Sequence, residues 1–424
     1  MSRPAIASWC LYDWASSAFN TVIGTFIFSV YFAQAVYGDT TEGSVVWGYA
    51  IGGAGLAVAL VGPLLGAIAD QSGRRKPWIA GFTALCIVAT AFLYLVEPGR
   101  AFVFIAVVLV VIATIAFELG SIFYNASLQV VAPRDKLGRV SGCGWSLGYF
   151  GGLCCLGLAL VGLVQPDVPW FGFGTDAAQQ IRATALLTAV WFGLFSIPYF
   201  FFVPDSHKSS QSVGQLFISG LGQLCATIRD VRRHGPIVIF LIASALYRDG
   251  LATLFAFGGL YAAGVYLMDI EEIMIFAIAL NVTAGLGALS FAWFDDRFGS
   301  KDMILASLAG LLFFGFVILF VDDQQIFFWL ALGLGFFVGP TQSASRSLMT
   351  RLSPDAMETE MFGLYAMTGK SAAFLGPIFY AVATDFFGTQ RAGLVTILAA
   401  WLLGGLFLFF VPAPRPNGGS VASR

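Results

Sequence analysis

Long apolar stretches separated by short polar connections dominate the chain. A membrane-spanning helix needs about 20 mostly apolar residues at roughly 1.5 Å each, and twelve segments meet that length. We predict spans at residues 6–37, 45–69, 77–96, 101–131, 140–163, 183–203, 236–267, 273–294, 303–320, 326–352, 360–386 and 392–411. The chain is therefore expected to be an all-α membrane protein.

One longer polar segment, residues 205–235, interrupts this pattern and holds both histidines. It separates six predicted spans from six, so we divide the chain into bundles at residues 1–204 and 236–424. Apolar positions recur within it near helical spacing, which predicts an amphipathic helix on the membrane surface. Those positions are Val213, Leu216, Phe217, Leu221, Leu224 and Ile228. We interpret the segment as a tether, with a regulatory role as the alternative.

Composition supports a lipid-facing surface. The chain is 58% hydrophobic and 11% charged, whereas soluble domains carry roughly 25% charged residues. The net charge of −2 gives no reason to expect a nucleic-acid partner. The six cysteines lack metal-ligand spacing, and HExxH, GxSxG and Walker motifs do not occur. We expect no cofactor, no metal, no disulfide framework and no enzymatic activity.

Basic residues are distributed unevenly over the predicted connections. With the N-terminus in the cytoplasm, sixteen of the 22 Lys and Arg residues lie on cytoplasmic loops or ends, and only Arg100, Arg182 and Arg391 lie on the opposite side. Cytoplasmic loops of membrane proteins carry an excess of Lys and Arg. Both termini are therefore expected in the cytoplasm.

The two halves repeat each other. The loop after the second span and the loop after the eighth each place a glycine three residues beyond an acid, Asp70 or Asp296, and each carries basic charge. Further matching pairs are Pro133 with Pro354, Gly142 with Gly363 and Gly148 with Gly369, at a constant offset of 221 residues, and Asp13 with Asp249. Asn125 matches Arg346 at the same offset of 221. The pattern indicates duplication of a six-helix unit.

Several motifs carry a family resemblance that covers essentially the whole chain. The loop after the second span resembles the G-x-x-x-D-x-x-G-R-R/K signature of major facilitator transporters. Residues 12–19, YDWASSAF, resemble the YDWANSAF segment of the autophagy-related vacuolar amino-acid effluxers and their bacterial relatives, with Ser16 where that branch usually has Asn. Residues 342–347, 363–370 and 376–377 also resemble that branch.

The resemblance implies two pseudo-symmetric bundles and a cytoplasmic gate at the signature loops. It implies that Asp70 pairs with Arg74 or with the start of the eleventh helix, bracing the halves while the transporter is open to the outside. A tight turn that obeys the positive-inside rule is the alternative. The candidate gate residues are Gly66, Asp70, Gly73, Arg74, Arg75, Asp296, Arg297 and Gly299.

Six ionisable residues lie inside the predicted spans, where a charge costs about 2.5–3.5 kcal/mol or more. Helical rise places Lys370 about 15 Å and Glu118 about 22 Å from the cytoplasmic end. We expect Lys370 to bind a carboxylate as a point charge and Arg346 to bind a carboxylate or a phosphate through two parallel hydrogen bonds. Glu118 and Asp13 are the candidate proton carriers, Asp13 alternatively anchoring its helix. The other candidate substrate-binding residues are Arg248, Asp249, Asn125, Asn20, Gln342, Tyr149 and Tyr365. For all of them, internal pairing or hydrogen bonding between helices is the alternative.

These features favour a monomeric secondary active transporter that moves an amino acid or similar small zwitterion by alternating access, with protons as the expected coupling ion. A lipid or amphiphile flippase is the alternative within transport, and a non-transporting membrane receptor or assembly protein is the alternative from another class. Short loops and the bacterial relatives in the resemblance favour a bacterial inner membrane.

Overall fold

Eleven helical segments in the described part of the chain are long and apolar enough to cross a membrane. The computed structural model describes residues 2–166, 168–205, 219–220, 222–223, 226–227, 235–268 and 270–412. The amphipathic helix predicted within residues 205–235 rests on positions outside these ranges. The boundaries at 204 and 236 stay predictions.

The helices before residue 205 form one group. Four short segments make up the first span: α1 (Arg3–Ala18), η1 (Phe19–Phe26), α2 (Phe28–Tyr31) and η2 (Phe32–Tyr37). The remaining elements are α3 (Thr40–Ser72), α4 (Lys76–Phe92), η3 (Leu93–Leu95), η4 (Arg100–Phe102), α5 (Val103–Ala126), α6 (Leu128–Val131), η5 (Arg134–Lys136), α7 (Leu137–Ala159), η6 (Leu160–Val164), η7 (Trp170–Gly172), η8 (Asp176–Ala178) and α8 (Gln179–Phe202). Wide π-helical turns in η1 and η2 interrupt the regular helix of the first span.

The helices after residue 234 form the second group. They are α10 (Gly235–Tyr266), α11 (Ile270–Phe298), α12 (Ser300–Ile318), α13 (Gln324–Leu352), α14 (Glu358–Ala372), α15 (Leu375–Phe387) and α16 (Gln390–Phe409). Two of these helices, α13 and α16, have a side-chain cap at the N-terminus. Asp323 accepts from the Ile326 N–H at 2.8 Å, and Thr389 accepts from the Arg391 N–H at 3.3 Å.

The eleventh predicted span, residues 360–386, is not one continuous helix. α14 ends at Ala372 and α15 begins at Leu375, so the prediction of an unbroken span is wrong. Pro377 explains the break, because proline lacks an N–H and its ring clashes with the carbonyl four residues earlier, here Ala373. Within a membrane such a break is tolerated where protein surrounds it.

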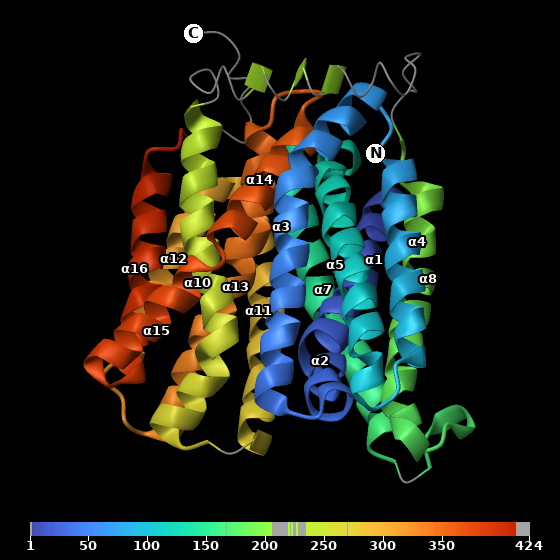
Figure 1. The fold of residues 1–424 in the computed structure, drawn as a ribbon. Helices are drawn as coiled ribbons and strands as arrows, with labels where there is room; N and C mark the ends of the chain where they lie inside the picture. Colours follow the sequence, from blue (N-terminus) through green and yellow to red (C-terminus); the bar gives the residue numbers. More distant parts are fainter. Residues whose placement is uncertain are drawn as a thin grey trace.

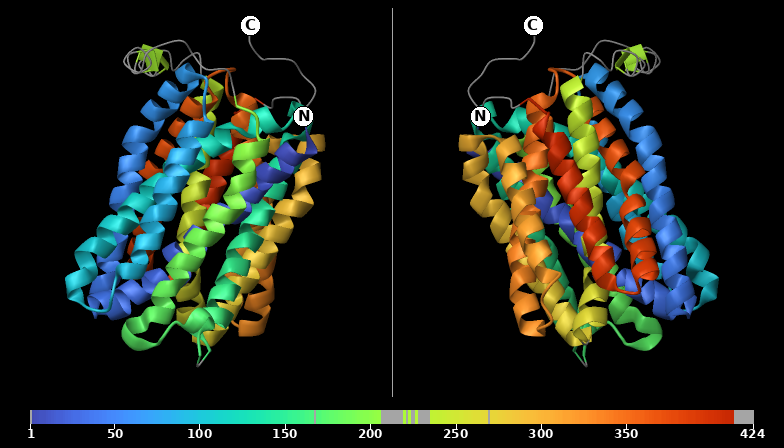
Figure 2. Two further views of the ribbon diagram at one scale, coloured as in Figure 1. Left: turned by 90° about the vertical axis from the view of Figure 1, so that its right-hand side faces the viewer. Right: turned by 90° about the vertical axis from the view of Figure 1, so that its left-hand side faces the viewer.

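The two groups lie side by side, with α1 beginning and α16 ending at the same end of the bundle (Figure 1). Most long helices run between the two ends of the bundle (Figure 2). At the junction α3 packs on α14, and α7 packs on α11. In the repeat α3 corresponds to α11 and α7 to α14, so the two packings are equivalent. A pseudo-two-fold axis therefore relates the groups.

Small residues allow the helices at the junction to approach closely. A Cβ added to Gly142 on α7 would lie 2.5 Å from the Cβ of Ala292 on α11, and one added to Gly363 on α14 would lie 2.7 Å from the Cα of Pro63 on α3. Small residues at such crossings let membrane helices pack backbone to backbone. This closeness brings side chains of one half into contact with the other half.

Candidate functional site

An ion pair joins the two halves inside the bundle. Lys370, near the end of α14, donates from Nζ to Oε1 of Glu118 on α5 at 2.7 Å. The two side chains remain 32% and 24% exposed, although charges inside membrane bundles are usually shielded. The stem of Lys370 lies beside Gly55 of α3, where an added Cβ would be 3.5 Å from Cδ. A solute that reaches this pair therefore meets a cation and an anion together.

A second cation lies next to Lys370. Arg248 on α10 places its guanidinium 4.1 Å from the ring centre of Tyr365 and donates from Nη1 to the Tyr365 carbonyl at 3.2 Å. A Cβ added to Gly369 would lie 2.9 Å from the same Nη1 atom. Arg248 thus contacts the backbone just before Lys370, and a cation–π contact, worth about 0.5–2 kcal/mol, holds it there.

Arg346 on α13 inserts into the opposite half and is 3% exposed. Its Nη1 donates to Asp13 Oδ2 on α1 at 2.8 Å and to Asn125 Oδ1 on α5 at 3.3 Å. Nε and Nη2 donate to the side chain and the carbonyl of Ser141 on α7, at 2.9 and 2.7 Å. Protein groups of the other half thus occupy the donors of Arg346, so in this conformation it holds the halves together and does not face a solute.

Aromatic rings surround the Arg346 guanidinium. Its Cζ lies 4.6 Å from the ring centre of Trp9, 5.4 Å from Trp145 and 5.9 Å from Tyr124. These three residues and Ser141 were not predicted from the sequence. A signal existed for Trp9, which precedes Asp13 by four residues and therefore lies on the same face of a helix.

The neutral candidates are distributed differently. Tyr149 on α7 donates from its hydroxyl to Gln342 Oε1 on α13 at 2.5 Å, a further bond between the halves. Asn125 contacts Arg346, as described above. Asn20 lies in η1 and is exposed. Of the predicted substrate-binding residues, Lys370, Arg248 and Tyr365 are gathered around the end of α14, whereas Arg346 and Asn125 belong to the buried contact.

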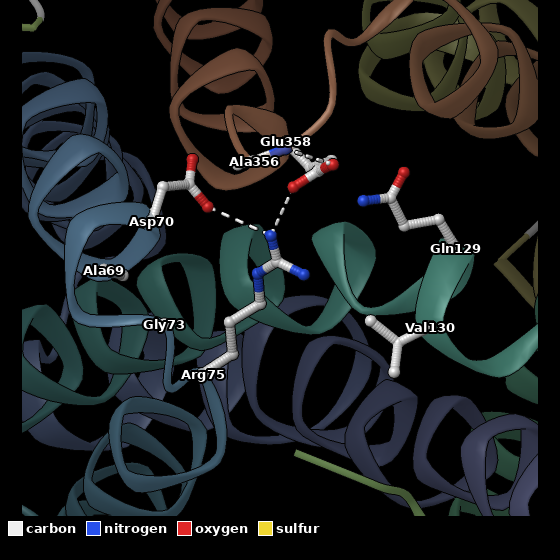
Figure 3. Close-up of a pocket in the computed structure, with 8 residues that line it drawn as sticks. All are labelled: Ala69, Asp70, Gly73, Arg75, Gln129, Val130, Ala356 and Glu358. Atoms are coloured by element: carbon white, nitrogen blue, oxygen red, sulfur yellow. Dashed lines mark hydrogen bonds and ion pairs between the residues drawn. The ribbon is translucent and has the colours of Figure 1, made fainter. Parts of the chain in front are cut away.

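The signature loop of the first half contacts the start of α14. Asp70 accepts from the backbone N–H groups of Thr359 at 3.2 Å and Glu360 at 2.8 Å. Its ion pair is with Arg75, at 3.0 Å, and Arg75 also pairs with Glu358 at 2.5 Å. Figure 3 shows Arg75 pointing between the two carboxylates. Burial lowers the pKa of Arg75, but the carboxylates of Asp70 and Glu358 outweigh that effect and leave the pKa of Arg75 above its usual value, so the guanidinium stays charged.

The second signature loop makes the equivalent contact with the first half, at the start of α7. Asp296 at the end of α11 accepts from the backbone N–H of Gly138 at 2.7 Å and of Arg139 at 3.2 Å. It also pairs with the Arg139 side chain at 2.7 Å and with Arg351 at 3.4 Å. Gly138 and Arg139 precede Thr359 and Glu360 by the repeat offset of 221. Each loop acid therefore caps the repeat-equivalent helix N-terminus of the other half, where the helix dipole favours a negative charge.

The other predicted gate residues have different surroundings. Gly73 and Gly299 adopt φ of +68° and +99°, which other residues rarely tolerate, so both loops turn there. Arg74 is exposed, and Arg75 instead of Arg74 pairs with Asp70. Arg297 is exposed and lies over Phe298, 5.5 Å from its ring centre. Three further members of these clusters, Glu358, Arg139 and Arg351, were not predicted from the sequence.

The fold and the charge clusters between two repeated halves define a multi-pass membrane transporter of the major facilitator type. The model of the vacuole effluxer Atg22-like family matches residues 36–417, and the chain belongs to that family. This membership places it among transporters and not among enzymes. No cluster of potential metal ligands occurs within the described residues.

Individual proteins are similar to the chain to different extents. An uncharacterized MFS-type transporter of Bacillus subtilis, YxiO, is 26% identical over 96% of this chain and 94% of its own length. Autophagy-related protein 22 of Cryptococcus neoformans is 26% identical over 61% of this chain, and the match spans about half of the fungal protein (48%). The proton:xylose symporter XylE has a similar fold, with a TM-score of 0.72 at 14% identity over 97% of this chain and 96% of XylE.

Proposed function

We propose that the chain is a secondary active transporter that moves a small polar or zwitterionic solute, an amino acid or a similar compound, by proton-coupled alternating access. The observation that carries this proposal is the Lys370–Glu118 pair. Its two charges come from different halves, lie inside the bundle and stay partly exposed. Ionisable residues within a membrane mark solute pathways by default.

The chemistry of the pair fits a zwitterion. The carboxylate of an amino acid would bind Lys370, and its ammonium group would bind Glu118. Arg248, held against Gly369, supplies a second positive charge for a solute with a further acidic or polar group. A solute that replaces the pair with two ion pairs of its own keeps every charge compensated, which a neutral sugar would not do.

The distribution of contacts between the halves supports alternating access. The two signature loops lie at the same end of the bundle, which we call the signature-loop end. The polar contacts between the halves lie between this end and the level of Lys370. They are made by Asp70, Asp296, Arg346 and Lys370. This arrangement fits a state that is closed at the signature-loop end, the predicted cytoplasmic side. Opening that end requires both loop acids to release the helix N-termini, a rocking motion of two rigid halves.

Relatives inform the coupling and the location. XylE, which shares the fold, is a proton:xylose symporter, and YxiO is a bacterial MFS-type transporter. We therefore propose a monomer in a bacterial inner or plasma membrane, with protons as the driving ion. The alternatives are a lipid or amphiphile flippase and a non-transporting receptor or assembly protein. The binding and transport experiments distinguish them from an amino-acid transporter.

A thermal-shift screen in detergent tests the binding step. The ligands are amino acids, dipeptides, sugars, organic acids and lipids, applied to the wild type, Lys370→Ala and Lys136→Ala. Lys136 is an exposed lysine in η5, away from the pair, and serves as the matched control. A ligand at 100 times its Kd stabilises the folded state by about 2.7 kcal/mol. We expect an amino-acid hit that survives in Lys136→Ala and disappears in Lys370→Ala. A hit confined to lipids would instead support the flippase.

A further inference from the structure

The break between α14 and α15 lies against α10. Gly376, in the first turn of α15, approaches α10 so closely that an added Cβ would lie 2.0 Å from Thr253 Oγ1 and 2.9 Å from Asp249 Oδ2. The first N–H groups of a helix have no partner within it and carry partial positive charge. The Asp249 carboxylate therefore faces the N-terminus of a half-helix inside the bundle.

Asp249 is buried without full compensation. The residue is 6% exposed, and its Oδ1 atom has no hydrogen-bond partner among the described residues. The Thr253 hydroxyl donates to the Asp249 backbone carbonyl at 2.8 Å and not to the carboxylate. A helix terminus stabilises a carboxylate by about 2 kcal/mol at most, whereas a buried charge without a partner costs several kcal/mol. The terminus alone does not compensate an ionised Asp249.

No basic side chain in the described ranges forms an ion pair with Asp249. Its neighbour Arg248 is turned toward Tyr365. The other charged groups on the helices that pack against α10 either bind other residues or are exposed. The bound groups pair as Lys370 with Glu118, Arg346 with Asp13, Arg351 with Asp295 and Asp296, Glu358 with Arg75, Glu360 with Gln223, and Arg391 with Asp322. The exposed groups are Glu272, Arg297 and Asp385. The nearby tyrosines are Tyr247, bonded to Ser345, and Tyr380 on α15.

The repeat shows why one acid has a cation and the other has none. Asp13 and Asp249 match between the halves, and Asp13 pairs with Arg346 at 2.8 Å. The residue that matches Arg346 in the first half is Asn125, which carries no charge. The duplicated unit thus supplies a counter-charge for Asp13 but not for Asp249. Some other positive charge must neutralise Asp249 when it is buried.

We infer that Asp249 is the proton-binding site that couples transport to the proton gradient. It takes one proton from the solution on the open side onto Oδ1, is buried as the neutral acid, and returns the proton as a carboxylate after the halves have rocked. A proton needs only one lone pair, which Oδ1 offers, whereas a metal cation needs several oxygen ligands. The inference rests on the proposed function. It moves the coupling site to Asp249 from Glu118 and Asp13, because those two acids already pair with Lys370 and Arg346.

Infrared difference spectroscopy of the full-length protein in lipid tests proton binding without any substrate. Spectra are compared between acidic and alkaline pH for the wild type, Asp249→Asn, Asp385→Asn and Glu118→Gln. Asp385 is an exposed acid on α15 and is the matched control. We expect a protonated-carboxyl band that is lost in Asp249→Asn and kept in the other variants. The same band in Asp249→Asn, or its loss in Glu118→Gln, would overturn the inference.

Transport in proteoliposomes gives the second readout, with a mixture of radiolabelled L-amino acids as the probe. Asp249→Asn should lose accumulation driven by a pH gradient but keep exchange across the membrane without a gradient, because an amide imitates the neutral acid. Accumulation driven by a sodium gradient in the wild type would contradict the inference. If no amino acid is transported, the proposed function fails while the infrared result still decides the role of Asp249. Asp249→Glu, which keeps a carboxyl group, replaces Asp249→Asn if the amide variant does not fold.

Discussion

Arg346 on α13 donates a hydrogen bond to Asn125 on α5 at 3.3 Å, and the two residues occupy the same position in the two halves of the repeat. Equivalent residues can touch only where the pseudo-two-fold axis passes between them. Arg134 and Asp355, which differ by the same offset, pair at 3.2 Å at the signature-loop end. The axis therefore runs through the buried Arg346 contact, which places this contact where the halves would rock.

Removing the carboxylate of Asp13 should open the signature-loop end. In Asp13→Asn the buried Arg346 guanidinium loses its counter-charge, which costs about 3–5 kcal/mol in the closed state. Cys10, buried on α1, provides the reporter because its thiol contacts Val140 beside this cluster. With the other cysteines replaced, labelling of Cys10 by a small thiol reagent should accelerate in Asp13→Asn.

Cys86, kept as the sole cysteine of a second protein, supplies the control for that experiment. It is fully buried on α4, away from the junction, so its labelling should not change in Asp13→Asn. Equal acceleration at Cys10 and Cys86 would indicate general unfolding. Unchanged labelling at Cys10 would contradict the role of the Asp13–Arg346 pair as a contact that holds the end closed.

Closure of the signature-loop end should depend on the small size of Gly66. A Cβ there would lie 2.5 Å from the Thr359 carbonyl oxygen of α14, and such overpacking costs about 1–3 kcal/mol. Gly66→Ala should therefore favour the state that is open at that end and slow transport. Gly53→Ala on the same helix is the control, since nothing lies within 4 Å of its added Cβ. Cysteine accessibility measures both variants, and equal behaviour would refute the prediction.

The two loop acids should contribute similarly to closure. Asp70 and Asp296 each cap a helix of the other half, and losing a charged cap costs about 1–2 kcal/mol. Asp70→Asn and Asp296→Asn should each shift the equilibrium toward the open state by that amount. Arg134→Ala breaks only an exposed pair, worth at most about 1 kcal/mol, and should have a smaller effect. Distances between spin labels on the two halves report the shift. A larger effect of Arg134→Ala would contradict the assignment.

A double-mutant cycle separates a binding role of Lys370 and Glu118 from a purely structural one. Each single change, Lys370→Met or Glu118→Gln, leaves the other charge without its partner and should lower stability. The double variant removes both charges and should recover part of that stability. Ligand binding should nevertheless stay lost in the double variant, by at least about tenfold or 1.4 kcal/mol. Binding that returns together with stability would assign the pair a structural role only.

Much of the fold could be predicted because hydropathy reports directly on membrane spans. The break in the eleventh span was not predicted, since a hydropathy window averages over residues 360–386 and does not register a missing N–H. Pro377 was the available signal, because its ring excludes the carbonyl of Ala373 from a continuous helix.

The members of the site could be predicted better than their pairings. Charges inside spans are conspicuous in a sequence, so Asp13, Glu118, Arg346 and Lys370 were found. Which acid meets which base depends on how two halves dock, and the sequence contains no measure of that geometry. The choice of Arg75 over Arg74 has the same origin, because adjacent residues in a turn point in different directions.

Counterflow in proteoliposomes measures solute exchange through the Lys370–Glu118 site. Vesicles loaded with unlabelled L-amino acids receive the labelled mixture outside, with no gradient of protons or sodium, for the wild type, Lys370→Ala and Lys136→Ala. We expect rapid uptake of label by the wild type and Lys136→Ala, and none by Lys370→Ala. Uptake by Lys370→Ala at the wild-type rate would contradict the assignment of the Lys370–Glu118 pair as the solute site, and no uptake by any protein would contradict amino-acid transport itself.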